Sequence, residues 1–306
     1  MIEERVISTL RESGPMTGEE LLRRTGEDVF RLWQTCRNSD KVVEWNAGRR
    51  FLRLDRAVEG YARLSPSIRR EFQTYTVLGL KDQIAEIEDY TRSLVREIRR
   101  VSQAKFDLAG QVVTSIVSSL GDGELIREKT CFILAGDITY EMAHSVPRPE
   151  ISTGKMVRGS DLDLVVATDI DIPKDVLIDL DEAIHTRKYY LLTHPAYREE
   201  IDYIIKPLSR IEEQMRFDIF GAMVACKILR EGVFLHGSIT LFQTVKNLLE
   251  ENQIPEKLEL LEERARCYRQ KAEKCLQDLS SPPGESEHIN LFFTREERLE
   301  DTFDSG

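Results

Sequence analysis

Residues 158–166 read Arg-Gly-Ser-Asp-Leu-Asp-Leu-Val-Val, and this run constrains the fold more than any other part of the chain. A β-strand alternates its faces with a period of two, so Asp161 and Asp163 project from one side and the neighbouring leucines from the other. Two carboxylates side by side on a rigid strand repel each other unless a positive charge lies between them. A divalent ion that prefers oxygen ligands, such as Mg²⁺, suits this position, as in phosphoryl and nucleotidyl transfer. The alternative is an exposed strand end whose acids face water.

The bulk properties indicate a globular protein of two or more domains. The chain has 306 residues, of which 41% are hydrophobic and 32% charged, as expected for a helix-rich protein with real cores. No apolar run approaches the length of a membrane span, and the N-terminus lacks the pattern of a secretory signal. The five cysteines are scattered without a CxxC pair, which predicts reduced thiols and a cytoplasmic location. The net charge of −11 argues against a protein that coats nucleic acid with its whole surface, although one basic face is compatible with it.

Residues 1–56 show three short helical patterns followed by two alternating segments. Thr17 and Glu20 form a capping-box pattern at the start of the second helix. The segments 42–45 and 49–54 flank an Asn-Ala-Gly turn and predict a hairpin. This order resembles a winged helix-turn-helix domain, whose third helix lies in the DNA major groove. The basic residues that would contact DNA phosphates are Arg31, Arg37, Lys41, Arg49, Arg50 and Arg53. The alternative is a module that only packs or dimerises.

Residues 57–125 are predicted to form a helical connector. Ser65 and Pro66 are typical of a helix start, and the segment 67–80 is amphipathic. A longer pattern over 81–119 carries apolar residues at three- and four-residue spacings. Such a stripe indicates a helix packed against a core, and a helix–helix homodimer interface is the alternative.

Residues 126–250 are predicted to form an α/β domain. A buried strand over 131–135 ends at Gly136 and Asp137, and a loop or inserted hairpin follows over 145–157. The aspartate strand comes next, then a helix over 174–190 and a strand over 200–205 that carries Asp202. A charged C-terminal helix is predicted over 251–279, and residues 280–306 read as an acidic, mobile tail. The expected fold class is α+β, with a mixed sheet in the central domain.

Residues 130–240 resemble the polymerase-β-type nucleotidyltransferase superfamily. The resemblance rests on Gly-Ser-Asp-Leu-Asp-Leu at 159–164, on Asp202 within a later apolar strand, and on the run 220–237. In that superfamily two strand aspartates and a third aspartate bind two Mg²⁺ ions and are catalytic. By resemblance these would be Asp161, Asp163 and Asp202. The metals would bridge the triphosphate of a bound NTP and activate an acceptor hydroxyl for attack on the α-phosphorus, with release of pyrophosphate.

The chain departs from the superfamily pattern at its first motif. A strand followed by Gly-Ser or Gly-Gly normally cradles phosphates with backbone amides, but here the residues are Gly136 and Asp137. An aspartate beside a triphosphate is unfavourable unless it binds metal or turns away. The remaining candidate phosphate-binding residues flank the aspartate pair or lie in the insertion before it: Gly159, Ser160, Lys155 and Arg158.

The sequence therefore predicts a cytoplasmic, Mg²⁺-dependent nucleotidyltransferase. The acceptor is a protein side chain, a small molecule or an RNA end, and the net charge disfavours a long nucleic acid. The rival hypothesis is a non-catalytic transcriptional regulator, in which the winged helix binds DNA and the altered domain senses a nucleotide. A third interpretation is an oligomeric scaffold built on the connector helix.

Overall fold

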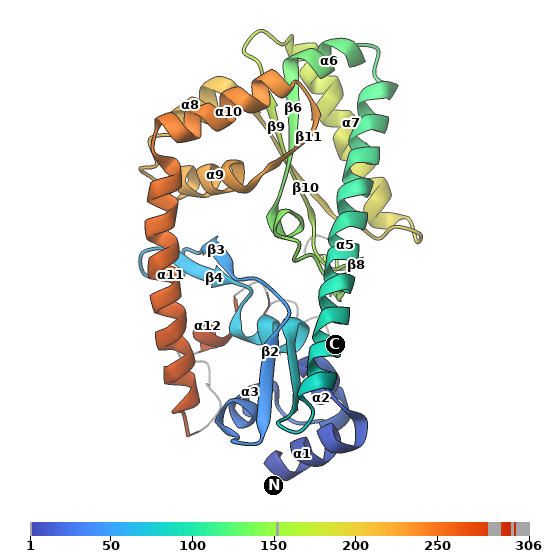
Figure 1. Cartoon of the computed structure of the whole chain (residues 1–306). Coiled ribbons are helices and arrows are strands. Elements are labelled where there is room, and N and C mark those ends of the chain that lie inside the picture. The colour runs from blue at the N-terminus through green and yellow to red at the C-terminus, as the bar shows by residue number, and fades with distance from the viewer. Residues whose placement is uncertain (1, 151–152, 281–288, 295–296, 298–306) are drawn as a thin grey trace. The chain divides into compact units, whose positions relative to one another are not determined.

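The chain divides into two compact units. Figure 1 shows a computed structural model of the chain, which describes residues 2–150, 153–280, 289–294 and 297. The first unit combines residues 1–97 with 261–306, and the second comprises residues 98–260. Helices α5 (Ile84–Ser119) and α11 (Ile254–Gln277) each contribute one part to both units. The predicted connector over 57–125 is therefore not a separate domain. None of the helices in the described part of the chain is long and apolar enough to cross a membrane.

The first unit is built on a three-stranded sheet with the order β1-β5-β2, in which both neighbours run antiparallel to β5. A separate two-stranded sheet pairs β3 with β4. The elements of this unit, besides α5 and α11, are α1 (Ile2–Ser13), β1 (Met16–Thr17), α2 (Gly18–Thr25), α3 (Val29–Asn38), β2 (Val42–Asn46), β3 (Phe51–Leu54), β4 (Ala62–Ser65), α4 (Ile68–Arg70), a π-helical turn (Glu71–Tyr75), β5 (Thr76–Leu80) and α12 (Ile289–Phe292).

The predicted hairpin between residues 42–45 and 49–54 is wrong. A turn does begin at Asn46, whose side chain accepts a hydrogen bond from the Gly48 amide at 2.7 Å. The two strands nevertheless separate, because β2 pairs with β5 and β3 pairs with β4. All five residues of β5 are buried, so β2 forms its strand pairing with a strand that lies inside the core.

The predicted helix over residues 67–80 is also only partly present. Its first residues form α4 and the π-helical turn, and the chain then becomes strand β5. The cap is Ser67, whose side chain accepts from the Arg70 amide at 3.0 Å, and not Ser65. The capping box at Thr17 and Glu20 is confirmed.

Part of the predicted mobile tail belongs to the core of the first unit. Phe292 in α12 is 1% exposed, and its ring centroid lies 5.3 Å from that of Phe30 and 5.5 Å from that of Trp33. The prediction of a mobile tail is therefore wrong for residues 289–294. Residues 281–288, 295–296 and 298–306 lie outside the described part.

The second unit contains a mixed four-stranded sheet with the order β10-β9-β6-β11. Strands β9 and β10 are parallel, and β6 runs antiparallel to both β9 and β11. The elements of this unit are α6 (Gly123–Lys129), β6 (Thr130–Ala135), a 3₁₀ helix (Gly136–Tyr140), β7 (Pro147–Pro149), β8 (Met156–Arg158), β9 (Leu162–Thr168), α7 (Lys174–Thr193), β10 (Ile201–Pro207), α8 (Leu208–Gln214), α9 (Phe220–Glu231), β11 (Val233–Gly237) and α10 (Ile239–Glu251).

Helices cover both faces of this sheet (Figure 1). One face packs its apolar side chains, such as Leu162 and Leu164, against α5 and α7. Helices α9 and α10 contact β6. The apolar residues of α5, including Ala109 and Val113, are thus part of an intramolecular core, and the homodimer through this helix stays a prediction. The α+β class is confirmed, and the predicted insertion contains the β7–β8 hairpin.

We expect Phe292→Ala to destabilise the first unit by about 3–5 kcal/mol, because it leaves a cavity among buried rings. Both tryptophans, Trp33 and Trp45, lie in this unit, so urea unfolding followed by tryptophan fluorescence reports on it selectively. The control is Asn290→Ala, an exposed position on the same helix, which should change stability by less than about 0.5 kcal/mol. Equal effects of the two variants would contradict the assignment of α12 to this core.

Candidate functional site

The parallel pairing of β9 with β10 brings two of the predicted metal ligands together. Asp163 lies opposite Asp202 on one side and opposite Ala135, the last residue of β6, on the other. Leu162 and Leu164 are buried on the apolar face, so the side chain of Asp163 lies on the other face. The alternation predicted for this strand is thereby confirmed.

The carboxylate of Asp163 lies against Gly136, the residue that follows β6. Gly136 has a φ of +75°, and a Cβ atom there would lie 2.1 Å from Asp163 Oδ2. Among the residues that the structure describes, none forms a hydrogen bond or an ion pair with this carboxylate. Loss of hydration raises the pKa of Asp163 to about 7, and the negative charges that add to this rise are those of Asp137, Asp202 and Glu231. A positive ligand would therefore relieve a real electrostatic cost here.

Asp161, the first aspartate of the predicted pair, has a different environment. It precedes β9, and its carboxylate forms an ion pair with Arg148 of β7. Arg148 also pairs with Glu200 at 2.8 Å and donates from Nε to the backbone oxygen of Gly159 at 3.0 Å. The inserted hairpin thus provides a cation for Asp161.

The insertion also holds the two cations that the sequence predicted to bind phosphate. Lys155 and Arg158 are exposed. The backbone oxygen of Arg158 accepts from Lys105 Nζ at 2.7 Å, and its amide donates to the backbone oxygen of Arg198 at 2.8 Å. Arg148 is the insertion residue that pairs with Asp161, and no sequence signal distinguished it from the other two.

Gly159 and Ser160 hold the loop before β9 in place. The amide of Ser160 donates to the backbone oxygen of His144 at 3.1 Å, and the amide of His144 donates to Ser160 Oγ at 3.2 Å. Gly159 has a φ of +63°, and a Cβ atom there would lie 1.8 Å from the same His144 oxygen. The hydroxyl of Ser160 in turn donates to Asp137 Oδ2 at 3.1 Å. These two residues, predicted to bind phosphate, therefore position the chain and Asp137.

Glu231, at the end of α9, is a residue of this site that sequence reasoning missed. Its carboxylate accepts from the Gly136 amide at 3.3 Å and from the Tyr140 hydroxyl at 2.6 Å. Lys227, one turn earlier on α9, forms an ion pair with Glu231 and lies 5.4 Å from the centre of the Tyr140 ring. The Gly136 amide predicted to bind phosphate is thus occupied by a carboxylate of the same chain. The i, i+4 pairing of Lys227 with Glu231 was the available sequence signal.

The acidic side chains do not form a ready-made metal cage. Asp202 is exposed and pairs with Lys188 at 3.0 Å. In the described ranges, no group of three or more His, Cys, Asp and Glu side chains is gathered so that it could hold a metal ion as it stands. The site consists of an unpaired Asp163 surrounded by carboxylates that have partners.

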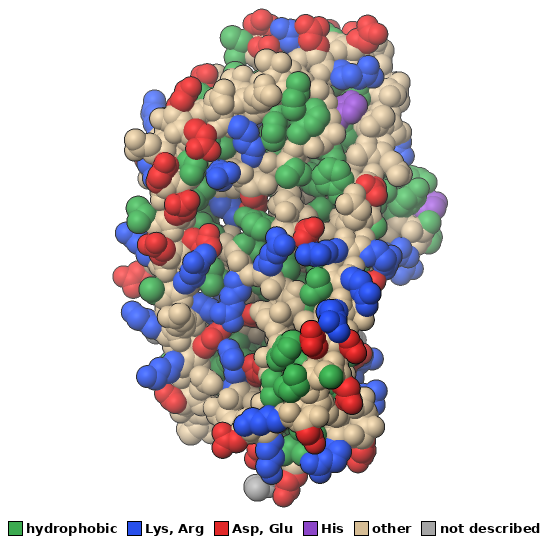
Figure 2. Space-filling view, viewed as in Figure 1, with side chains coloured by type: hydrophobic (Ala, Val, Ile, Leu, Met, Phe, Trp, Pro, Cys, Tyr) green, Lys and Arg blue, Asp and Glu red, His purple; other side chains and the backbone are tan. Residues whose placement is uncertain are grey.

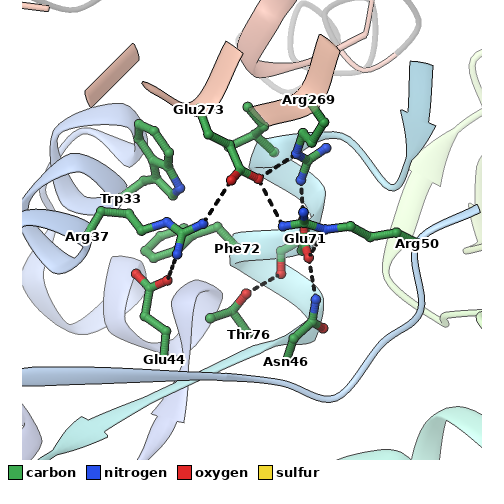
Figure 3. Close-up of a pocket in the computed structure, with 11 residues that line it drawn as sticks. Trp33, Arg37, Glu44, Asn46, Arg50, Glu71, Phe72, Thr76, Arg269 and Glu273 are labelled. Carbon is green, nitrogen blue, oxygen red and sulfur yellow. Dashed lines mark hydrogen bonds and ion pairs between the residues drawn. The ribbon is translucent and has the colours of Figure 1, made fainter. Parts of the chain in front are cut away.

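Two of the predicted DNA-contacting arginines instead line a cavity of about 110 Å³ in the first unit (Figure 3). Arg37 pairs with Glu44 at 3.0 Å and with Glu273 at 3.2 Å. Arg50 pairs with Glu71 and with Glu273, each at 2.9 Å. A phosphate contact by either arginine would have to break these pairs. Of the other predicted contacts, Arg53 is half-buried, whereas three are exposed, namely Arg31, Lys41 and Arg49.

Glu44 is the residue of this network whose ionised side chain is disfavoured. Its Oε1 atom is buried and has no hydrogen-bond partner among the described residues. Burial raises the pKa of Glu44 to about 7, and the negative charges of Glu273 and Glu71 act in the same direction, while Arg37 opposes them. Ionised Glu44 therefore costs the folded state free energy.

We expect Asp163→Asn and Asp161→Asn to shift the stability of the second unit in opposite directions. At pH 8, Asp163→Asn removes an unpaired charge and should stabilise by about 1–3 kcal/mol. Asp161→Asn leaves Arg148 short of a partner and should destabilise by about 1–3 kcal/mol. Hydrogen exchange of the β6 and β9 amides measures both effects, and shifts of the same sign would contradict the contrast between the two environments.

A second prediction concerns Glu44. Its folded pKa lies above the unfolded value of 4.5, so its contribution to stability is greatest below pH 4.5 and is lost as the pH rises through 7. Glu44→Gln should match the wild type near pH 4.5 and exceed it at pH 8 by about 1–3 kcal/mol. Urea unfolding followed by tryptophan fluorescence tests this, with the exposed Glu12→Gln as control. A stability difference between Glu44→Gln and the wild type that stays constant at every pH would refute the raised pKa of Glu44.

Comparisons with known proteins give no further identification of this site. Searches against protein-family models, curated proteins and solved structures found no match. The geometry of the chain itself is therefore the basis for a functional proposal.

Proposed function

We propose that the second unit is a nucleotidyltransferase that uses a divalent cation to transfer a nucleoside monophosphate from an NTP to an acceptor hydroxyl. The observation that carries this proposal is the carboxylate of Asp163. It lies beside Asp202 on neighbouring parallel strands and has no hydrogen bond or ion pair within the described residues. The aspartate-bearing strands are also those expected from the superfamily resemblance.

The donor atoms of this site fit Mg²⁺. Carboxylate oxygens are its preferred protein ligands, and Mg²⁺ usually takes only one or two of them together with water and substrate phosphates. The absence of a three-residue cage among the described residues is compatible with this coordination preference. Asp163 and Asp202 would hold the ion. When bound, it would neutralise charge on the triphosphate and orient the reacting phosphorus.

Two donors near Asp163 suit the phosphates of the nucleotide. These are the amide of Gly136 and the ammonium of Lys227, both of which contact Glu231. Phosphate oxygens would take the place of the Glu231 carboxylate on these donors. The chain's own residues would then bind the triphosphate through one backbone and one charged contact.

The rival proposal, a DNA-binding regulator, has one supporting observation. The helix order and the β1-β5-β2 sheet of the first unit resemble a winged helix, with residues 47–75 between the last two strands. However, Arg37 and Arg50 already pair with protein carboxylates. On the face shown in Figure 2, acidic and basic side chains are interspersed. We therefore favour a packing role for this unit.

The test is to incubate the full chain with Mg²⁺, each labelled NTP and pools of protein, small-molecule and RNA acceptors. We expect pyrophosphate release and label transfer, and a loss on the order of 100-fold in Asp163→Asn and Asp202→Asn, because charge stabilisation in the transition state is lost. The matched control is Asp169→Asn, in the Asp-x-Asp that follows the other end of β9.

The control variant should keep the wild-type rate. The proposal fails if no nucleotide is turned over with any acceptor pool. It also fails if Asp169→Asn lowers the rate as much as Asp163→Asn does.

A further inference from the structure

We propose that the C-terminal end of α7 and the loop after it form a docking surface for the end of a single-stranded RNA. The inference rests on the proposed function and deepens it, because it selects one of the three acceptors that remain open. We call this surface the tyrosine patch. It combines exposed or half-buried rings of α7 and its loop with basic residues of that loop and of the β8 region, namely Tyr189, Tyr190, Tyr197, Lys155, Arg158 and Arg198.

The rings at the end of α7 pack on one another and stay partly open to solvent. The ring centroid of His194 lies 4.9 Å from that of Tyr190 and 5.5 Å from that of Tyr197. Tyr190 is 40% exposed, and the neighbouring Tyr189 is 60% exposed. Large exposed rings present flat faces on which nucleobases can stack. A stacked base would cover apolar surface that water now reaches.

Cations lie beside these rings. Lys155 Nζ is 6.0 Å from the centre of the Tyr189 ring. The amide of Arg158 donates to the backbone oxygen of Arg198 at 2.8 Å, which brings β8 next to the loop after α7. Within the described residues, neither Lys155 nor Arg198 forms an ion pair with a carboxylate. Their charges are therefore available to phosphate groups.

The two segments that meet at the patch lack acidic residues. Residues 183–198 and 153–160 contain no aspartate or glutamate, although the whole chain has a net charge of −11. The acids that follow the first segment each pair with a protein cation, namely Glu199, Glu200 and Asp202. A strongly acidic protein repels a long nucleic acid, whereas a local basic surface attracts the few phosphates of a short single-stranded end.

The patch borders the proposed cation site. Strand β10 is an edge strand of its sheet, and α7 leads into it through the loop 194–200. Lys188, directly before Tyr189, reaches this edge and pairs with Asp202 at 3.0 Å. An RNA end on the patch would thus have its terminal hydroxyl near the aspartates that would hold the cation. The hydroxyl oxygen would bond to the α-phosphorus as its proton is lost to water and pyrophosphate leaves.

The chemistry of the patch favours RNA over the other two acceptors. Phosphates match the cations and bases match the tyrosine faces, and a single-stranded RNA carries both in alternation. An acidic peptide offers charge without a series of flat rings. A small molecule would engage only a part of the patch.

The test is fluorescence anisotropy of a labelled single-stranded RNA of about 12 nucleotides, titrated with the full chain without metal or NTP. We expect Tyr189→Leu to weaken RNA binding by about 5–150-fold, because a stacking face is lost. Tyr189→Phe keeps the ring and should bind within about twofold of the wild type. The exposure of Tyr189 means that neither substitution disturbs the core.

Arg198→Asn tests the charge of the patch. Arg198 has a φ of +53°, a conformation that Asn tolerates. The variant should weaken RNA binding and reduce the salt dependence by about 0.7 in the slope of log affinity against log salt concentration. The matched control is Lys174→Gln, an exposed position at the other end of α7, which should change neither quantity. Polyglutamate should compete poorly, because it carries charge without bases.

The possible outcomes separate this inference from the proposed function. If the chain binds no RNA, if Tyr189→Leu binds as tightly as Tyr189→Phe, or if polyglutamate competes as well as unlabelled RNA, the inference is overturned. The proposed function then stands with a protein or small-molecule acceptor. If RNA binds through the patch but no nucleotide is turned over with any acceptor pool, the proposed function fails while the RNA-binding surface stands.

Discussion

The register of β9 between β10 and β6 is the constraint on which the candidate site depends. It aligns Asp163 with Asp202 on one side and with the end of β6 on the other. The same register buries Leu162 and Leu164 on the apolar face. Because the side-chain period of a strand is two, a slip of one residue would bury the aspartate and expose the leucines. The apolar core thus fixes the position of the carboxylates.

The site concentrates negative charge at one corner of this sheet. Asp161, Asp202 and Glu231 each have a protein cation as a partner, whereas Asp163 has none in the described residues. An unpaired carboxylate among other acids lowers stability and persists when a ligand supplies the compensation. The protein therefore carries an electrostatic cost at Asp163, one of the residues that would hold the proposed cation.

The sequence predicted the features of the site that follow from local periodicity. Alternation identified the strand of Asp163, and an apolar run identified the strand of Asp202, which proved to be its neighbour. The sequence could not show the ion pair of Asp161, because its partner Arg148 comes from an inserted hairpin whose docking depends on tertiary contacts. Glu231 was missed for the same reason, since it reaches Gly136 across about ninety-five positions of chain.

The errors in the first unit have a similar cause. The turn at Asn46 is real, but the partner of β2 lies about thirty residues further along the chain, beyond the reach of a local hairpin rule. Phe292 stands in a segment whose composition is acidic, and composition could not show that a single ring fills a gap beside Phe30. Arg37 was judged by its charge alone, without its partners Glu44 and Glu273.

The most direct test of the account is a crystal structure of the chain with Mn²⁺ and a non-hydrolysable NTP analogue, recorded with anomalous scattering. The account predicts an anomalous peak at coordination distance, about 2.0–2.2 Å, from oxygen atoms of Asp163 and Asp202. A bound nucleotide with no metal at Asp163 would contradict it.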